Sequence, residues 1–224
     1  MFNPPSMKLW LVIAVVWALA WPALAGTVEG KVEVREPAKI KRNPGSDRYG
    51  PGGLKGDKAK KEAVSETENV VISVLEFTTA APAKPLKVSI RQLDKAFVPY
   101  LTAIRTGTTV DFPNGDKIFH SVFSESATQK FHLPEYPQGD SRSVTFTKPG
   151  HVELFCAIHT HMNAHIMILP NEFFTRPQKN GDFRLEKLPA GKLKIQAWHP
   201  KLGSQVKVVE VPKDGTVKVS FALK

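Results

Sequence analysis

The chain has 224 residues, a formal net charge of +10, 42% apolar residues and one cysteine. A single cysteine excludes an intramolecular disulfide framework, and the ordinary apolar content excludes a chain that is disordered throughout. The charge alone would suit a nucleic-acid-binding protein, but eight basic residues against two acidic ones fall within residues 38–61. The basicity is therefore local.

Residues 1–25 have the pattern of a secretory signal peptide. Lys8 precedes an apolar run of about a dozen residues, and a small-residue cleavage motif ends at Ala25. An uncleaved membrane anchor is the alternative, although the apolar run stops at Trp21-Pro22, short of the roughly 20 residues that span a bilayer. We expect cleavage and a periplasmic location. A lone thiol in an oxidising compartment then needs a shield, a partner chain or a metal.

Residues 37–66 follow a first predicted strand and are expected to form a flexible basic loop. The segment is rich in glycine and lysine and has few apolar residues, so it cannot offset its ordering entropy by burial. A solvated linker is one interpretation. An electrostatic arm for an acidic partner or an anionic membrane surface, through residues 38–61, is the other. Few aromatic residues are interleaved with the charges, so no nucleic-acid partner is expected.

The remaining segments predict an all-β protein. Short alternating or β-branched runs are separated by turn signals such as PNGD, KPG and PAGK, as in antiparallel sandwiches and barrels. Residues 171–224 hold too few strands for a stable sandwich. We expect residues 26–36 and 67–83 to complete it, with residues 84–170 inserted as a separate domain. A short helical turn is predicted over residues 171–174.

The single cysteine lies in a histidine-rich hairpin. Period-2 alternation puts Val152, Leu154 and Cys156 on one face, so Cys156 ends a strand facing the core. Cys156, His159 and Met162 follow with C-x2-H-x2-M spacing. A loop of that length can curl a thiolate, an imidazole and a thioether around one point.

A fourth ligand must come from elsewhere, and His120 in FPNGDKIFHSVFS is the candidate. Two imidazoles and one thiolate with a weak thioether suit copper that cycles between Cu(I) and Cu(II). Coordination would also protect the thiol from oxidants. The sequence therefore predicts one copper ion held by His120, Cys156, His159 and Met162.

On these residues the chain resembles the cupredoxins, the plastocyanin and azurin family of blue-copper proteins. FVPYLTAIRTGTTVDFPNGDKIFHSVFS, KPGHVELFCAIHTHMNAHIMIL and GDFRLEKLPAGKLKIQAWHP are similar to bacterial plastocyanin-like chains labelled methylamine utilisation proteins. The resemblance implies a Greek-key cupredoxin β-sandwich over residues 84–170. It also implies a second, carboxypeptidase-regulatory-like β-sandwich that residues 171–224 complete.

The chain departs from the cupredoxin pattern at three positions. Ser121 stands where many cupredoxins have an asparagine that ties the two ligand loops together. His161 lies beside Met162, and His165 follows three residues later. Either histidine could replace Met162 as the axial ligand, which would favour Cu(II).

The expected function is that of a periplasmic type 1 copper protein. It would transfer single electrons between redox partners such as a cytochrome or a dehydrogenase. Motifs of hydrolases and phosphate-binding enzymes are lacking, so the chain is expected not to be an enzyme. The alternatives are a copper protein for storage, delivery or sensing, and a scaffolding sandwich with a structural metal site.

Overall fold

A computed structural model gives the structure of residues 25–35, 66–79 and 86–224. The expected signal peptide and basic loop lie outside these residues except for Ala25 and Glu66. Within them, strands dominate, and the one helical element is the short 3-10 helix η1 (Glu66–Asn69). None of the described residues forms a helix of the length and hydropathy that a membrane crossing requires. The prediction of an all-β protein is confirmed.

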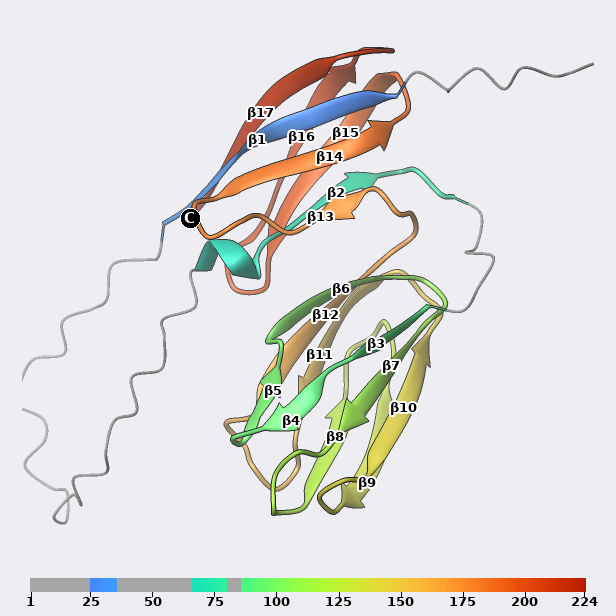
Figure 1. The fold of residues 1–224 in the computed structure, drawn as a ribbon, viewed down its shortest axis with the longest axis vertical. Helices are drawn as coiled ribbons and strands as arrows, with labels where there is room; N and C mark the ends of the chain where they lie inside the picture. The colour runs from blue at the N-terminus through green and yellow to red at the C-terminus, as the bar shows by residue number, and fades with distance from the viewer. Residues whose placement is uncertain (1–24, 36–65, 80–85) are drawn as a thin grey trace, which may run out of the picture.

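The first β-sandwich contains ten strands, which lie in the lower half of Figure 1. One sheet has the order β10-β7-β3, a second has the order β6-β12-β11-β8-β9, and β4 and β5 form a hairpin. The strands are β3 (Lys87–Ser89), β4 (Arg91–Leu93), β5 (Ala96–Val98), β6 (Leu101–Arg105), β7 (Thr108–Pro113), β8 (His120–Ser124), β9 (Phe131–Tyr136), β10 (Ser141–Phe146), β11 (Gly150–Phe155) and β12 (Asn163–Leu169).

The core of this sandwich lies between its two sheets. Phe112 on β7 and Ile166 on β12 belong to one buried cluster, which also contains Cys156 and Met162. Because side chains alternate along a strand, the neighbours of Ile166 on β12 face the other side of the five-stranded sheet. The strand therefore serves two cores, and both of its faces are buried.

The second β-sandwich combines strands from both ends of the described chain. The order β14-β1-β17 forms one sheet and β13-β2-β15-β16 the other. β1 lies antiparallel to β14 and parallel to β17 (Figure 1). The strands are β1 (Gly26–Val34), β2 (Val71–Leu75), β13 (Phe174–Thr175), β14 (Asp182–Leu188), β15 (Gly191–His199), β16 (Gly203–Val211) and β17 (Thr216–Leu223). The strands of the first sandwich lie between β2 and β13 in sequence.

A third buried cluster, which we call the seam, joins the two sandwiches. Leu101 and Met167 on the outer face of the five-stranded sheet pack with Val71 on β2, and Trp198 on β15 covers them. Arg176 strengthens the seam, because its guanidinium donates to the backbone oxygen of Leu101 at 3.1 Å. The outer face of β6 and β12 is thus buried against the second sandwich.

The prediction of a helical turn over residues 171–174 is wrong. The Asn171 side chain donates to the backbone oxygen of Val74 at 3.0 Å and accepts from the amide of Phe173 at 2.9 Å. An Asn side chain that takes a nearby amide competes with the helical hydrogen bond. The chain bends there and then forms β13 against β2.

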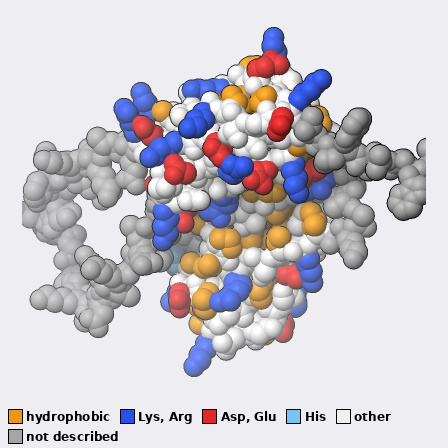
Figure 2. Space-filling model, turned by 45° about the horizontal axis from the view of Figure 1, so that its top comes forward, with side chains coloured by type: hydrophobic (Ala, Val, Ile, Leu, Met, Phe, Trp, Pro, Cys, Tyr) orange, Lys and Arg blue, Asp and Glu red, His pale blue; other side chains and the backbone are white. Residues whose placement is uncertain are grey.

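Figure 2 shows one face of the molecule, with charged side chains of both signs over its upper part and apolar side chains gathered towards the middle. Lysines and arginines alternate with acidic side chains rather than forming a field of one sign.

Candidate metal centre

The predicted ligands come from two neighbouring strands that end at the same side of the first sandwich. His120 is the first residue of β8, and Cys156 directly follows β11. β8 and β11 are paired through Phe123 and Phe155, so residues 36 apart in the chain come together. His159 lies in the loop between β11 and β12.

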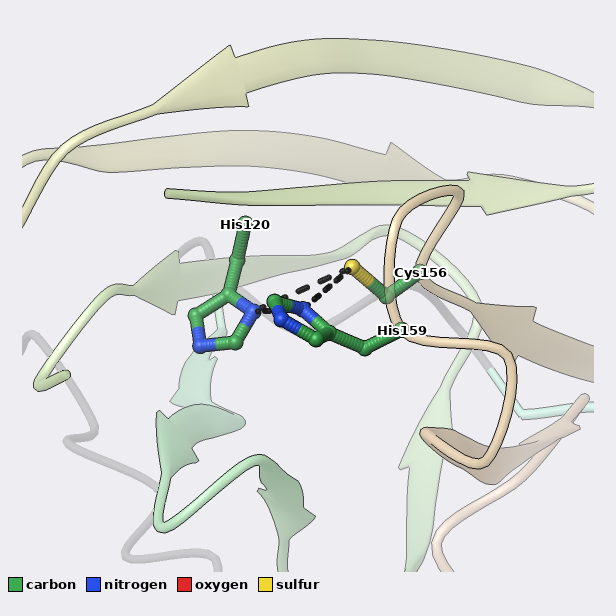
Figure 3. Close-up of side chains that lie close together, drawn as sticks. All are labelled: His120, Cys156 and His159. Atoms are coloured by element: carbon green, nitrogen blue, oxygen red, sulfur yellow. Dashed lines mark hydrogen bonds between the residues drawn. The ribbon is translucent and has the colours of Figure 1, made fainter. Parts of the chain in front are cut away.

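Three side-chain atoms converge at this position (Figure 3). The Cys156 Sγ lies 3.8 Å from the His120 Nδ1 and 3.8 Å from the His159 Nδ1. The two Nδ1 atoms lie 3.1 Å apart. Among the described residues, these three form the one group of at least three His, Cys, Asp or Glu ligand atoms with the mutual spacing of a metal site.

The spacing of the three atoms matches a trigonal metal site. A point equidistant from atoms at these separations lies about 2.1 Å from each, and protein zinc–imidazole and zinc–thiolate bonds are about 2.0–2.1 and 2.3 Å. A thiolate with two imidazoles is a borderline-soft donor set, which copper prefers over hard cations such as magnesium or calcium. The residues therefore fit a copper-sized, soft cation.

The hydrogen bonds of His120 fix which of its nitrogens can bind a cation. Its Nε2 lies 2.9 Å from the Oδ2 of Asp116, so Nε2 carries the proton and Nδ1 keeps its lone pair. Burial alone would raise the pKa of Asp116, but donors from the Lys95 backbone and His120 hold that pKa below its usual value. The carboxylate is therefore charged at neutral pH.

Hydrogen bonds within the ligand loop, and one to Ser121 on β8, hold the loop in its shape. The Met162 amide donates to the His159 carbonyl at 2.9 Å, and the Cys156 amide donates to the Met162 carbonyl at 3.3 Å. The Ala157 amide donates to the hydroxyl of Ser121 at 2.9 Å, and that hydroxyl lies 3.8 Å from the Cys156 Sγ. Ser121 thus ties the two ligand segments together, as the asparagine does in many cupredoxins.

Burial differs among the ligands. His120 and Cys156 are buried, whereas His159 is partly exposed. Burial lowers the pKa of His159, and the neighbouring His120 lowers it further. The residues that precede the two histidines, Phe119 and Ile158, are apolar and exposed at 52% and 44%. The centre is therefore reached from solvent on the His159 side, between apolar side chains.

Met162 and the two additional histidines lie in three different environments. Met162 is buried in the same core cluster as Cys156, and its role as a ligand stays a prediction. His161 is exposed, with its ring centroid 6.2 Å from that of His159. His165 lies on the seam face of β12, where its Nε2 is 2.9 Å from the Tyr100 hydroxyl and its Nδ1 is 3.0 Å from the His151 Nε2. It points away from the core that contains Cys156 and Met162.

Sequence reasoning missed Asp116 and Asn114. The PNGD segment was interpreted as a turn, and it is one, because the Asp116 amide donates to the Asn114 Oδ1 at 2.9 Å. The available signal was an acidic residue four positions before a candidate ligand histidine. A histidine that binds metal usually donates its other ring N–H to a carboxylate or carbonyl, so that spacing could have identified Asp116.

No protein-family model and no curated protein matches the chain. Among solved structures it is similar to the Cu-containing nitrite reductase (NirK) from Thermus scotoductus SA-01, with 28% identity and a TM-score of 0.37. The match covers 42% of this chain and 25% of the reductase, so the chain spans about a quarter of that structure.

The chain is also similar to amicyanin structures. One is a reduced mutant form, with 17% identity and a TM-score of 0.36 over 44% of this chain and 98% of amicyanin. Another is a reduced Cu(I) form at pH 4, with 18% identity, a TM-score of 0.34 and the same coverages. At these TM-scores the likenesses decide nothing about the site, whose chemistry rests on its own atoms.

Proposed function

We propose that the protein is a periplasmic type 1 copper protein that transfers single electrons between redox partners. His120, Cys156 and His159 would hold the copper, and Met162 would be the axial ligand. The observation that carries this proposal is the convergence of three donor atoms, two imidazole Nδ1 atoms 3.1 Å apart and a thiol sulfur 3.8 Å from each. Two imidazole nitrogens that share no proton repel each other unless a cation lies between them.

When bound, copper supplies a one-electron couple, because thiolate and thioether suit Cu(I) and imidazoles suit both oxidation states. The chain contributes a preformed site. Hydrogen bonds fix His120 and the ligand loop, and the core shields Cys156 from water. A site whose ligands are already in place needs little rearrangement when its charge changes, which favours rapid electron transfer.

The exposed side of the site suits a docking partner. His159 is partly exposed, and Phe119, Ile158 and Ile118 surround the ligand positions in sequence and are exposed at 52%, 44% and 36%. An apolar rim lets a redox protein such as a cytochrome or dehydrogenase approach one ligand closely. The basic segment of residues 38–61 would attract an acidic partner or an anionic membrane surface.

We infer an electron carrier and not an enzyme. A Cys/His hydrolase needs a thiol that a substrate can reach. The Cys156 side chain is instead 3% exposed and faces two imidazoles. This burial supports ligation over nucleophilic attack.

The test is the spectrum of purified residues 26–224 after addition of Cu(II). We expect an intense thiolate-to-copper absorption band and narrow EPR hyperfine splitting, both lost in Cys156→Ala. A weak d–d band with wide splitting that Cys156→Ala leaves unchanged would overturn the proposal. In Met162→Ala, an unchanged reduction potential would reject Met162 as the axial ligand.

A role in copper storage or delivery is the second candidate, and the exposed His161 beside His159 is the observation that favours it. An additional imidazole at the mouth of the site would ease exchange of the metal. In that case a chelator would remove copper within seconds and His161→Ala would slow the removal. An electron carrier would keep its copper in both the Cu(I) and the Cu(II) state.

A further inference from the structure

The buried side of His120 faces a carboxylate that is itself tightly held. The Oδ2 of Asp116 lies 2.9 Å from the His120 Nε2 and accepts the Lys95 amide at 2.8 Å. Its Oδ1 accepts the Asp94 amide at 2.7 Å. The Asp116 side chain is 12% exposed, so this negative charge is nearly removed from solvent. Three donors surround it.

The turn that supplies the two amides is shaped for this contact. Asp94 and Lys95 connect β4 to β5 and have φ values of 54° and 56°. Residues other than glycine avoid the left-handed region at a cost of about 1 kcal/mol each. Two successive left-handed residues form the tight turn of a two-residue hairpin, and here both of their N–H groups point at one carboxylate.

A buried asparagine, Asn114, holds the backbone of Asp116. Asn114 accepts the Asp116 amide and donates to the carbonyls of Ile118 and Tyr136 at 2.8 and 3.0 Å. Four described segments therefore meet at Asp116: the β4–β5 turn, the 114–118 loop, β8 and, through Asn114, β9. Hydrogen bonds to its backbone and to its carboxylate therefore fix Asp116 beside the ring of His120.

We propose that Asp116 positions His120 and tunes the electrostatics of the metal centre. Its carboxylate would hold His120 as the Nε2–H tautomer, with Nδ1 free to ligate, and would favour Cu(II) over Cu(I). This inference rests on the proposed function and adds a residue that sets the reduction potential. His159 has no such support, since its side chain hydrogen-bonds to other described residues through Nδ1 alone.

The direction of the effect follows from charge. A nearby anion stabilises the more positive oxidation state and therefore lowers the reduction potential. A carboxylate on the far nitrogen also makes an imidazole a stronger donor, and loss of such outer partners costs about 10- to 100-fold in metal affinity. If Cu(I) binding is unaffected, each tenfold loss of Cu(II) affinity raises the potential by about 59 mV.

The experiment compares Asp116→Asn with Asp111→Asn. Asp111 is a partly exposed carboxylate on β7 that pairs with Lys87 and accepts from Ser143, and it takes no part in the centre. We expect Asp116→Asn to bind Cu(II) about 10- to 100-fold more weakly, with a higher potential and a retained thiolate band. Asp111→Asn should match the wild type. Equal potentials in a folded Asp116→Asn protein would overturn the proposal.

Two further measurements guard against misfolding and against failure of the copper proposal. Lys95→Gly favours the left-handed turn and serves as a stabilised background for Asp116→Asn.

In the metal-free protein, ¹⁵N NMR should show His120 as the Nε2–H tautomer, with a mixture of tautomers in Asp116→Ala. An unchanged tautomer in that variant overturns the role of Asp116. A changed tautomer in a protein that binds no copper retains this role and rejects the proposed function.

Discussion

Two pairs of histidines in this protein have nearly the same spacing and opposite chemistry. In the metal centre the ring nitrogens of His120 and His159 are 3.1 Å apart, and in the seam those of His151 and His165 are 3.0 Å apart. The seam pair ends at the Tyr100 hydroxyl, whose proton can start a continuous chain of hydrogen bonds. The centre pair lies beside the Cys156 thiol, and the ring proton of His120 is already donated to Asp116.

The groups around each histidine pair decide whether the pair shares protons or is suited to bind a cation. Burial raises the pKa of Tyr100, which keeps its hydroxyl a donor. Tyr100 can donate to His165, and His165 can then donate through its other nitrogen to His151. Every ring nitrogen between them has a partner. In the centre, the His120 Nδ1 offers a lone pair beside the His159 Nδ1 and the Cys156 sulfur, and one cation between them would bind all three donors.

The largest test of this contrast removes one histidine from each pair. We expect His120→Ala to reduce Cu(II) affinity on the order of 100- to 1,000-fold, by analogy with structural zinc sites, in which about four ligands share a binding free energy of about 10–16 kcal/mol. His165→Ala should change that affinity less than about threefold, because it lies on the opposite face of β12. Competition titration with a Cu(II) chelator measures both. A large loss of Cu(II) affinity in His165→Ala would show that the two histidine clusters act as one site.

The second test uses pH to address the seam alone. Burial, and then His151 and Lys201, lower the pKa of His165 from 6.5 to about 4. The unfolded chain therefore takes up the proton first, so His165 contributes stability above pH 6.5 that is lost as the pH falls towards 4. The Glu153 carboxylate and the His199–Glu66 pair face the same seam.

We expect metal-free protein to lose roughly 2–3 kcal/mol of unfolding free energy from this group between pH 7 and pH 4. Denaturant titrations followed by Trp198 fluorescence measure the loss, because Trp198 is the one tryptophan in residues 26–224 and its ring lies 4.8 Å from that of His151. His165→Phe should flatten the profile. An equal slope in that variant would assign the acid sensitivity to other groups.

The smallest effect concerns Ser121, the tie between the ligand segments. Ser121→Ala removes the acceptor of the Ala157 amide, and the loss of this hydrogen bond costs about 0.5–1.5 kcal/mol because Ala157 is exposed and water can replace the hydroxyl. We expect a lower melting temperature of the metal-free protein and a broadened thiolate band with copper. Ser124→Ala is the control, because the Ser124 hydroxyl accepts the Ser126 amide, away from the centre. Equal band widths in the two variants would show that Ser121 does not shape the site.

The sequence predicted the parts of this structure that depend on local pattern. Period-2 alternation placed Cys156 in the core at the end of β11, and short spacing placed His159 beside it. The sequence left open whether His165 is a bystander or an alternative to Met162, because its orientation depends on which side of β12 the second sandwich covers. Asp116 escaped notice for a related reason, since its donors come from the β4–β5 turn, about twenty residues earlier in the chain. Long-range packing determines the surroundings of both residues, and a local sequence pattern does not contain it.

The position of β1 constrains the order in which the two sandwiches can assemble. β1 comes first among the described strands, yet its partners β14 and β17 follow only after the whole first sandwich. The strands β3 to β12 are contiguous and can close their own core before those partners exist. Both edges of β1 stay unpaired in the meantime, and unpaired strand edges promote aggregation. The sandwich with the candidate metal centre can therefore close first, and β17, the last of the described strands, completes the second sandwich.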